Sequence, residues 1–190
     1  MTDKTITIVS GLPRSGTSMM MKILEAGGLE ILTDNKRTAD DDNPKGYFEY
    51  EKVKDLEKDQ SWLDDAVGKV VKIISFLLKD MSPAHHYKII FMQRTMNEIL
   101  ASQKQMLIRR GQPTDTISDE KMAKTFFAHL NKIKDWLNQQ SNMDVLFINY
   151  NDVLANPNEH IVDITKFLGN GLDQKSMAKV VDKNLYRQRK

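Results

Sequence analysis

The sequence predicts an α/β fold in which a central parallel sheet of about four or five strands lies between two layers of helices. Short runs rich in Val, Ile and Phe alternate along the chain with longer segments whose apolar residues recur at helical spacing. The short runs contain few charged residues, which is typical of strands buried on both faces of a parallel sheet. Alternation of strand and helix favours a doubly wound arrangement.

Four runs are predicted to form strands, and they are Thr5 to Ser10, Val70 to Ile74, Lys88 to Met92 and Val145 to Tyr150. Helices are predicted over Thr17 to Ala26, Met96 to Arg110, Asp119 to Gln140 and Ile161 to Leu168. Glycine directly follows the first, second and last of these helices, and glycine often ends a helix.

Two helix starts carry capping signals. Thr95 with Glu98 fits a capping box, in which the two side chains bond each other's backbone N–H groups. Asn156 followed by Pro157 and Glu159 fits a cap, a first-position proline and an acidic first turn. The polar stretch from Asn35 to Gly46 is predicted to be a surface loop that acts on substrate.

Bulk composition limits the function classes. The 190 residues, 40% of them hydrophobic, are expected to form one domain over residues 1–190. The net charge is only +2, so no strong field favours nucleic-acid or membrane partners. The absence of cysteine excludes disulfides and thiol redox chemistry. With neither a signal-like leader nor an apolar run of about 18 residues, we expect a soluble cytoplasmic protein.

The stretch GLPRSGTS, residues 11–18, lies between the first strand and the first helix. Gly11 and Gly16 bracket four residues, as in a Walker phosphate loop, but Thr17 occupies the lysine position and the positive charge comes earlier, at Arg14. A glycine-rich turn can also simply connect a strand to a helix. The hydroxyl residues and the internal arginine instead favour an anion site.

A small anion fits this loop better than a triphosphate does. The candidate ligands are the backbone N–H groups from Ser15 through Gly16 to Ser18, the hydroxyls of Thr17 and Ser18, and the guanidinium of Arg14. Ser18 could bind Mg²⁺, but no predicted strand ends in the aspartate that supplies a second metal ligand in Walker-type enzymes. We therefore expect no metal.

Three segments, taken together, resemble sulfotransferases that use 3′-phosphoadenosine 5′-phosphosulfate (PAPS). GLPRSGTS is similar to the family's 5′-phosphosulfate loop. KIIFMQRTMNEILASQKQM resembles its strand, arginine and helix with a serine eight positions after the arginine, here Arg94 and Ser102. VLFINYNDVLANPNEHIVDITKFLG is similar to its Tyr-x-Asp stretch, followed by Asn-Pro and an amphipathic helix.

The resemblance implies a P-loop-type three-layer α/β/α fold and a short, bacterial-type member of the family. It also implies PAPS as donor and its desulfated form, PAP, as product. Arg94 and Ser102 are then expected to bind the 3′-phosphate, and Tyr150 the adenine. Among the last residues, Arg187 is the counterpart of a basic segment that closes this pocket, with Arg189 second; a frayed cationic terminus is the alternative.

The positions of two arginines directly after predicted strands also favour two neighbouring anion sites, without reference to the family. Arg14 and Arg94 each follow a predicted strand, and parallel strands bind ligands at their carboxyl ends. Taken alone, Arg94 would be interpreted as a salt-bridge partner of Glu98, and Ser102 as a solvated helix residue.

The catalytic residues are less clear from the sequence. Arg14 is the candidate that stabilises charge on the leaving group. VVKIIS resembles the strand in which cytosolic sulfotransferases carry a lysine and, two residues later, a histidine base, but here Lys72 is followed by Ile74. Lys72 is a candidate to stabilise the transferring group or the acceptor. The four histidines are interpreted as surface or packing residues.

Other branches of the family use a glutamate base, and NPKGYFE places Glu49 just after the long polar loop. Its alternative is a solvated carboxylate in a charged helix, and Asp41 and Asp42 are further candidates for the base. The predicted function is transfer of a sulfuryl group to a hydroxyl or amine of a small-molecule or other acceptor. A small-molecule or nucleotide kinase and a non-catalytic PAP-binding module remain the alternatives.

Overall fold

The computed structural model describes residues 4–36, 40, 46–169 and 171–182. Four of the candidate site residues lie outside these ranges: Asp41, Asp42, Arg187 and Arg189. Most of the predicted polar loop over residues 35–46 also falls outside the described residues.

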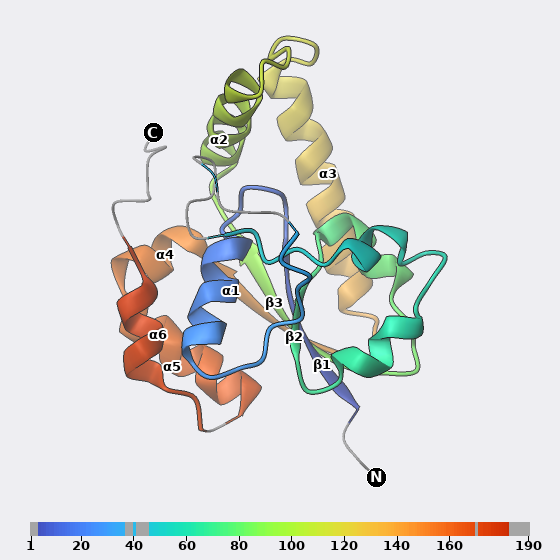
Figure 1. Ribbon diagram of the computed structural model, residues 1–190. Helices are drawn as coiled ribbons and strands as arrows, with labels where there is room; N and C mark the ends of the chain where they lie inside the picture. Colours follow the sequence, from blue (N-terminus) through green and yellow to red (C-terminus); the bar gives the residue numbers. More distant parts are fainter. Residues whose placement is uncertain (1–3, 37–39, 41–45, 170, 183–190) are drawn as a thin grey trace.

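A four-stranded parallel sheet forms the centre of the structure (Figure 1). Its strands are β1 (Thr5–Gly11), β2 (Val70–Lys72), β3 (His86–Gln93) and β4 (Met143–Asn149), in the order β2-β1-β3-β4. Gly11 lies opposite Met92, and Gln93 lies opposite Asn149. The carboxyl ends of β1, β3 and β4 therefore meet at one edge of the sheet. The strand number and direction confirm the predicted fold class.

Helices cover both faces of the sheet. They are α1 (Thr17–Ala26), α2 (Met96–Arg109), α3 (Asp119–Leu137), α4 (Tyr150–Ala155), α5 (Pro157–Leu168) and α6 (Gln174–Val180). Three 3₁₀ turns, η1 (Glu51–Asp55), η2 (Ser61–Ala66) and η3 (Ser75–Asp80), flank β2 in sequence. Figure 1 shows α1, α4, α5 and α6 on one side of the sheet, α3 and the 3₁₀ turns on the other, and α2 and α3 rising as a hairpin.

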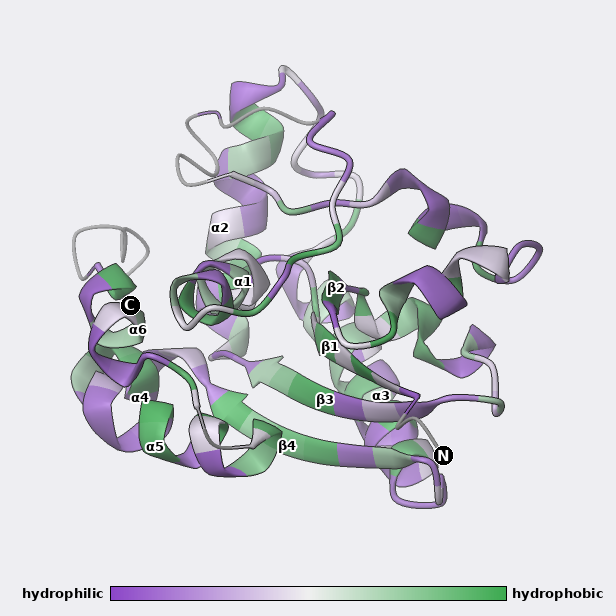
Figure 2. Cartoon of the chain, turned by 60° about the horizontal axis from the view of Figure 1, so that its bottom comes forward, coloured by the Kyte–Doolittle hydropathy of each residue, from purple (hydrophilic) through white to green (hydrophobic). Residues whose placement is uncertain are grey.

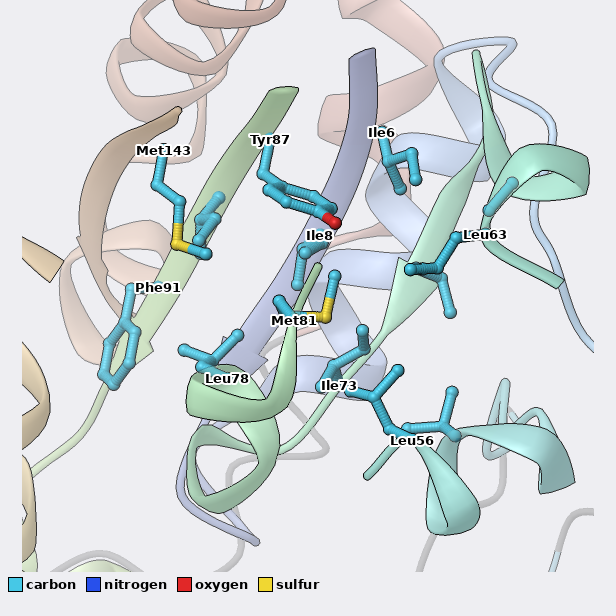
Figure 3. Close-up of a cluster of buried hydrophobic side chains, with 14 of the residues drawn as sticks. Ile6, Ile8, Leu56, Leu63, Ile73, Leu78, Met81, Tyr87, Phe91 and Met143 are labelled. Carbon is cyan, nitrogen blue, oxygen red and sulfur yellow. The ribbon is translucent and has the colours of Figure 1, made fainter. Parts of the chain in front are cut away.

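Successive strand residues face opposite sides of the sheet. Ile8 and Ile89 pack with the 3₁₀ turns and α3, whereas Val9 and Ile90 pack with α1, α4, α5 and α6. Figure 3 shows the first of these clusters, in which Leu78 of η3 lies near Ile8 and Ile73. In Figure 2 the arrowhead ends of β3 and β4 are hydrophobic. Both faces are buried along the later residues of β1 and β3, as their runs with few charges predict, whereas β4 exposes Asp144 and Phe147.

A third cluster lies beyond the strand ends. Leu12, in the loop after β1, packs with Ile99 and Leu100 of α2 and with Phe126 of α3. These contacts place the hairpin of α2 and α3 next to the glycine-rich loop. None of the helices in the described part of the chain is long and apolar enough to cross a membrane.

The element bounds match the prediction closely, with differences at the ends. The strand predicted to end at Ile74 ends at Lys72, because η3 begins at Ser75. The predicted capping box is wrong: Thr95 is the N-cap residue, but its side chain makes no capping bond, and Glu98 binds other partners. The charged helix considered as the alternative setting of Glu49 is not formed, since the residues after it make the 3₁₀ turn η1.

Candidate active site

The loop after β1 adopts a tight conformation that only some residue types allow. Gly16, the N-cap of α1, has φ 100°, and a Cβ there would overlap the Tyr150 ring. At Gly11, a Cβ would lie 2.5 Å from Ser15 Oγ and 2.6 Å from the Met92 carbonyl oxygen. Arg14 also has a positive φ, of 72°. The two glycines thus let the loop approach β3 and Tyr150 closely.

Backbone donors at the start of α1 point out of the helix. The first N–H groups of a helix have no intrahelical acceptor and carry its positive dipole. The Met20 N–H donates to the Gly16 carbonyl at 3.1 Å, as the first full turn of the helix requires. The Ser15 N–H donates to the Leu12 carbonyl at 3.1 Å, so it serves the turn itself. Of the four predicted N–H ligands, those of Gly16, Thr17 and Ser18 are best placed for an anion.

The side chain of Arg14 connects two predicted phosphate sites. Its Nε donates to Ser102 Oγ at 2.9 Å, although the two residues are 88 positions apart in the sequence. Ser102 lies on α2 and is buried. The guanidinium of the glycine-rich loop therefore reaches the helix that follows β3.

Arg94, which follows β3, contacts the backbone of the loop after β1. Its NH1 donates to the Arg14 carbonyl at 3.1 Å, and its Nε donates to Glu98 Oε2 at 2.8 Å. The Arg94 and Glu98 side chains are only 8% and 3% exposed, so this is a buried ion pair rather than a surface one. The predicted salt bridge between Arg94 and Glu98 is thus present, although it is buried. The same Arg94 side chain also supports the backbone of the loop after β1.

The ring of Tyr150 packs against the Arg94 guanidinium. Its ring lies 4.4 Å from the Arg94 guanidinium carbon, and burial raises the pKa of its hydroxyl. Glu98 Oε1 accepts a hydrogen bond from Asn151 Nδ2 at 2.9 Å. The carboxylate of Glu98 therefore joins α2 to the start of α4, while Tyr150 packs against Gly16 and Arg94 together.

A second group of polar side chains lies at the end of β2. Lys72 Nζ donates a hydrogen bond to the Tyr47 carbonyl and lies 3.8 Å from Glu49 Oε1. The Lys72 side chain is 9% exposed and that of Glu49 is 30% exposed. A carboxylate accessible to solvent thus stands beside a nearly buried ammonium group.

The structure brings Arg14, Arg94, Ser102 and Tyr150 into one group at the ends of β1 and β3, and Lys72 and Glu49 into another at the end of β2. Glu98 and Asn151 also belong to the first group, and the sequence did not predict them there. The polar Asn directly after Tyr150 offered a weak signal, but nothing in the spacing linked it to α2. Within the described residues, no three His, Asp or Glu side chains form a set of metal ligands.

Comparison with known proteins identifies the family. A family model described as the sulfotransferase domain matches residues 4–190. No curated protein sequence matches the chain.

Solved structures share the fold at low sequence identity. The sulfotransferase domain of the Synechococcus PCC 7002 olefin synthase has a TM-score of 0.55 and 14% identity, covering 98% of this chain and 84% of its own. Sulfotransferase STF1 of Mycobacterium tuberculosis H37Rv has a TM-score of 0.57 and 14% identity, with coverages of 96% and 72%. Mouse sulfotransferase SULT7A1, complexed with PAP, has a TM-score of 0.56 and 18% identity, with coverages of 94% and 64%.

These structures place the parallel sheet and its glycine-rich loop in a known fold, and the family model spans nearly the whole sequence. On that match, the predicted family is confirmed: this chain belongs to the sulfotransferase family.

Proposed function

We propose that this enzyme transfers the sulfuryl group of PAPS to a hydroxyl or amine of a small-molecule acceptor, as one cytoplasmic domain and without a metal ion. The observation that carries the proposal is the hydrogen bond from Arg14 to Ser102. It joins the loop suited to a 5′-phosphosulfate with the helix suited to a 3′-phosphate. PAP, the product of such a reaction, is bound in the mouse sulfotransferase of similar fold.

On the donor side, α1 and its preceding loop would hold the 5′-phosphosulfate. The backbone N–H groups at the start of α1, together with the hydroxyls of Thr17 and Ser18, suit the phosphate oxygens. Arg14 is placed to stabilise the charge that develops on the leaving phosphate. Ser102 and Arg94 would contact the 3′-phosphate and Tyr150 the adenine, with Arg187 closing the pocket.

On the acceptor side, Glu49 would act as the general base. Its carboxylate takes the proton of the acceptor hydroxyl as that oxygen bonds to sulfur, while the bond between sulfur and the 5′-phosphate oxygen breaks. Lys72, 3.8 Å from Glu49, supplies positive charge next to the transferring group. Lys72 is the last residue of β2, which pairs with β1 next to the donor loop, and Glu49 lies beside Lys72 from the segment before η1.

Calorimetric titration with PAP and with adenosine 5′-phosphate tests the donor site. We expect PAP to bind tighter by about 2 kcal/mol, because the 3′-phosphate gains charge-assisted hydrogen bonds. Ser102→Ala should reduce this preference, and Arg14→Ala should weaken binding of both nucleotides. Ser102 is a better test than Arg94, since removal of Arg94 would leave Glu98 buried without its charged partner. Equal affinities of the wild type for both nucleotides would contradict the 3′-phosphate assignment.

A transfer assay separates the proposal from its alternatives. PAPS and a panel of hydroxyl and amine compounds are incubated with the enzyme, and formation of PAP is measured. A sulfotransferase releases PAP only when an acceptor is present. Tight PAP binding without any turnover would indicate a nucleotide-binding module, and stabilisation by ATP with Mg²⁺ but not by PAP would indicate a kinase.

A further inference from the structure

Ser75, Phe76 and His129 form a cluster next to the end of β2, and none of them has a role in the proposed donor site. Ser75, the first residue of η3, is fully buried, and its Oγ lies 2.9 Å from His129 Nε2. His129 belongs to α3 and is 54 positions away in the sequence. This hydrogen bond ties the segment after β2 to the helix that covers this face of the sheet.

The same histidine supports an exposed aromatic ring. The rings of Phe76 and His129 are stacked, with centroids 3.9 Å apart and planes 14° apart. Phe76 is nevertheless 44% exposed, and Ile74 is 38% exposed. Two large apolar side chains thus face solvent on either side of a buried serine. One of them is held in place by a stacked imidazole.

This segment lies where an acceptor would arrive. It follows Lys72, which contacts Tyr47 and lies 3.8 Å from Glu49. A parallel sheet binds ligands at the carboxyl ends of its strands, and β2 is the neighbour of β1, which leads into the donor loop. The two apolar residues therefore follow within four positions of Lys72, at the same strand end as the polar pair that we assign to the chemistry of transfer.

Building on the proposed function, we propose that Ile74 and Phe76 contact the apolar body of the acceptor and that His129 is a positioning residue for Phe76. Burial lowers the pKa of His129, and the nearby Lys79 lowers it further, so the imidazole is neutral at neutral pH. A neutral ring can stack on Phe76 and bond Ser75 at the same time. Because Phe76 is already ordered, little side-chain entropy is lost when an acceptor packs against it.

The acceptor class follows from the chemistry of this surface. Ile74 and Phe76 offer apolar contact area, and the charged groups near them include Lys72, Glu49 and Lys79, which lies close to His129. A compound with an apolar ring or chain and a terminal hydroxyl matches both parts. Its body would lie on Phe76, and its hydroxyl would point toward Glu49.

Binding of 2-naphthol to the PAP-loaded enzyme, followed by its fluorescence, tests this inference without relying on turnover. Phe76→Ala should weaken naphthol binding by about tenfold or more, since an aromatic contact is lost. Phe127→Ala is the matched control: Phe127 is 53% exposed on the same helix as His129, but residues two apart on a helix face different directions. Its naphthol affinity should equal that of the wild type.

The role of His129 has its own pair of variants. His129→Ala removes both the stack and the hydrogen bond to Ser75, and we expect naphthol binding to weaken by about fivefold. His129→Gln can restore the hydrogen bond and should recover part of the affinity. PAP affinity, measured on the same samples, should be unchanged in all variants, which shows that they are folded.

Three results would overturn the inference. They are wild-type enzyme that does not bind naphthol, a Phe76→Ala variant that binds it as the wild type does, and a His129→Ala variant with unchanged naphthol affinity. Failure of the proposed function is a different result. In that case the wild type would not bind PAP, although naphthol binding can still be measured on the free protein.

Discussion

Arg94, a predicted ligand of the 3′-phosphate, also supports the loop after β1. Its NH1 donates to the Arg14 carbonyl at 3.1 Å, and Arg14 is held in a left-handed conformation with φ 72°. A non-glycine residue in that region is strained by roughly 1 kcal/mol or more. The bond from Arg94 helps to maintain this conformation, which directs the Arg14 side chain toward Ser102.

Replacement of Glu49 tests the identity of the general base. Glu49→Gln keeps the shape of the side chain but cannot accept a proton, so we expect turnover to fall by at least about tenfold. PAP affinity should stay unchanged, because we assign Glu49 to the acceptor side. The assay is PAP release from PAPS with the best acceptor of the panel.

Glu51→Gln is the matched control for this change, since Glu51 is an exposed carboxylate paired with Lys54 on the neighbouring turn. It should retain full turnover. Full activity of Glu49→Gln would remove Glu49 as the base and direct attention to Asp41, Asp42 and Lys72.

At the residue scale, the position of the turn between β1 and α1 is confirmed, while its anion ligands stay a prediction. The loop from Gly11 to Ser18 was predictable because its glycines, arginine and hydroxyls are adjacent in sequence. Glu98 was assigned to a capping box because its spacing from Thr95 fits one. It instead bonds Asn151, 53 positions away, and such a long-range partner leaves no local signal.

At the scale of elements, periodicity predicted the sheet and the longer helices well. The predicted helix over residues 17–26 has the observed bounds, and the ends of the predicted strands differ from the observed ones by two residues at most. The short elements α4, α6, η2 and η3 were not predicted. One or two turns contain too few apolar positions to establish a period, so tertiary packing determines them.

The junction of β1 and α1 depends on Gly16, and Gly16→Ala tests it. The added Cβ would overlap the Tyr150 ring, and φ 100° is unfavourable for alanine. We expect the free energy of unfolding to fall by about 2 kcal/mol or more in urea denaturation. PAP affinity should fall as well, because the start of α1 would shift.

Gly28→Ala is the control for conformational strain alone. Gly28 also has a positive φ, of 96°, but no described atom lies within 4 Å of the corresponding Cβ. It should lose less stability than Gly16→Ala and keep its PAP affinity. Equal losses in the two variants would show that the contact with Tyr150 contributes little.

At the scale of the whole molecule, stability should depend on pH through groups that folding perturbs. The pKa of His129 lies below its usual 6.5, first because of burial and then because of Lys79. The unfolded chain therefore binds more protons than the folded one as pH falls through this range, and stability decreases. Asp34, Asp64 and Asp173 have pKa values lowered from 3.8 by hydrogen bonds, so their contribution is lost only at more acidic pH.

Urea denaturation at about pH 7.5 and about pH 5.5 measures the contribution of His129. We expect the wild type to lose stability between these values. His129→Gln, which does not titrate, should lose less over the same interval. A loss of equal size in both proteins would contradict the direction of the His129 pKa shift.

The bond between Arg14 and Ser102 also has a consequence for synthesis on the ribosome. It spans 88 residues, so a nascent chain holds only part of the proposed donor site until α2 has emerged. The nucleotide therefore cannot assist the earliest steps of folding. Strands that are distant in sequence have to pair before the two halves of its site come together. Once bound, it stabilises the finished molecule alone, because the unfolded chain has no site for it.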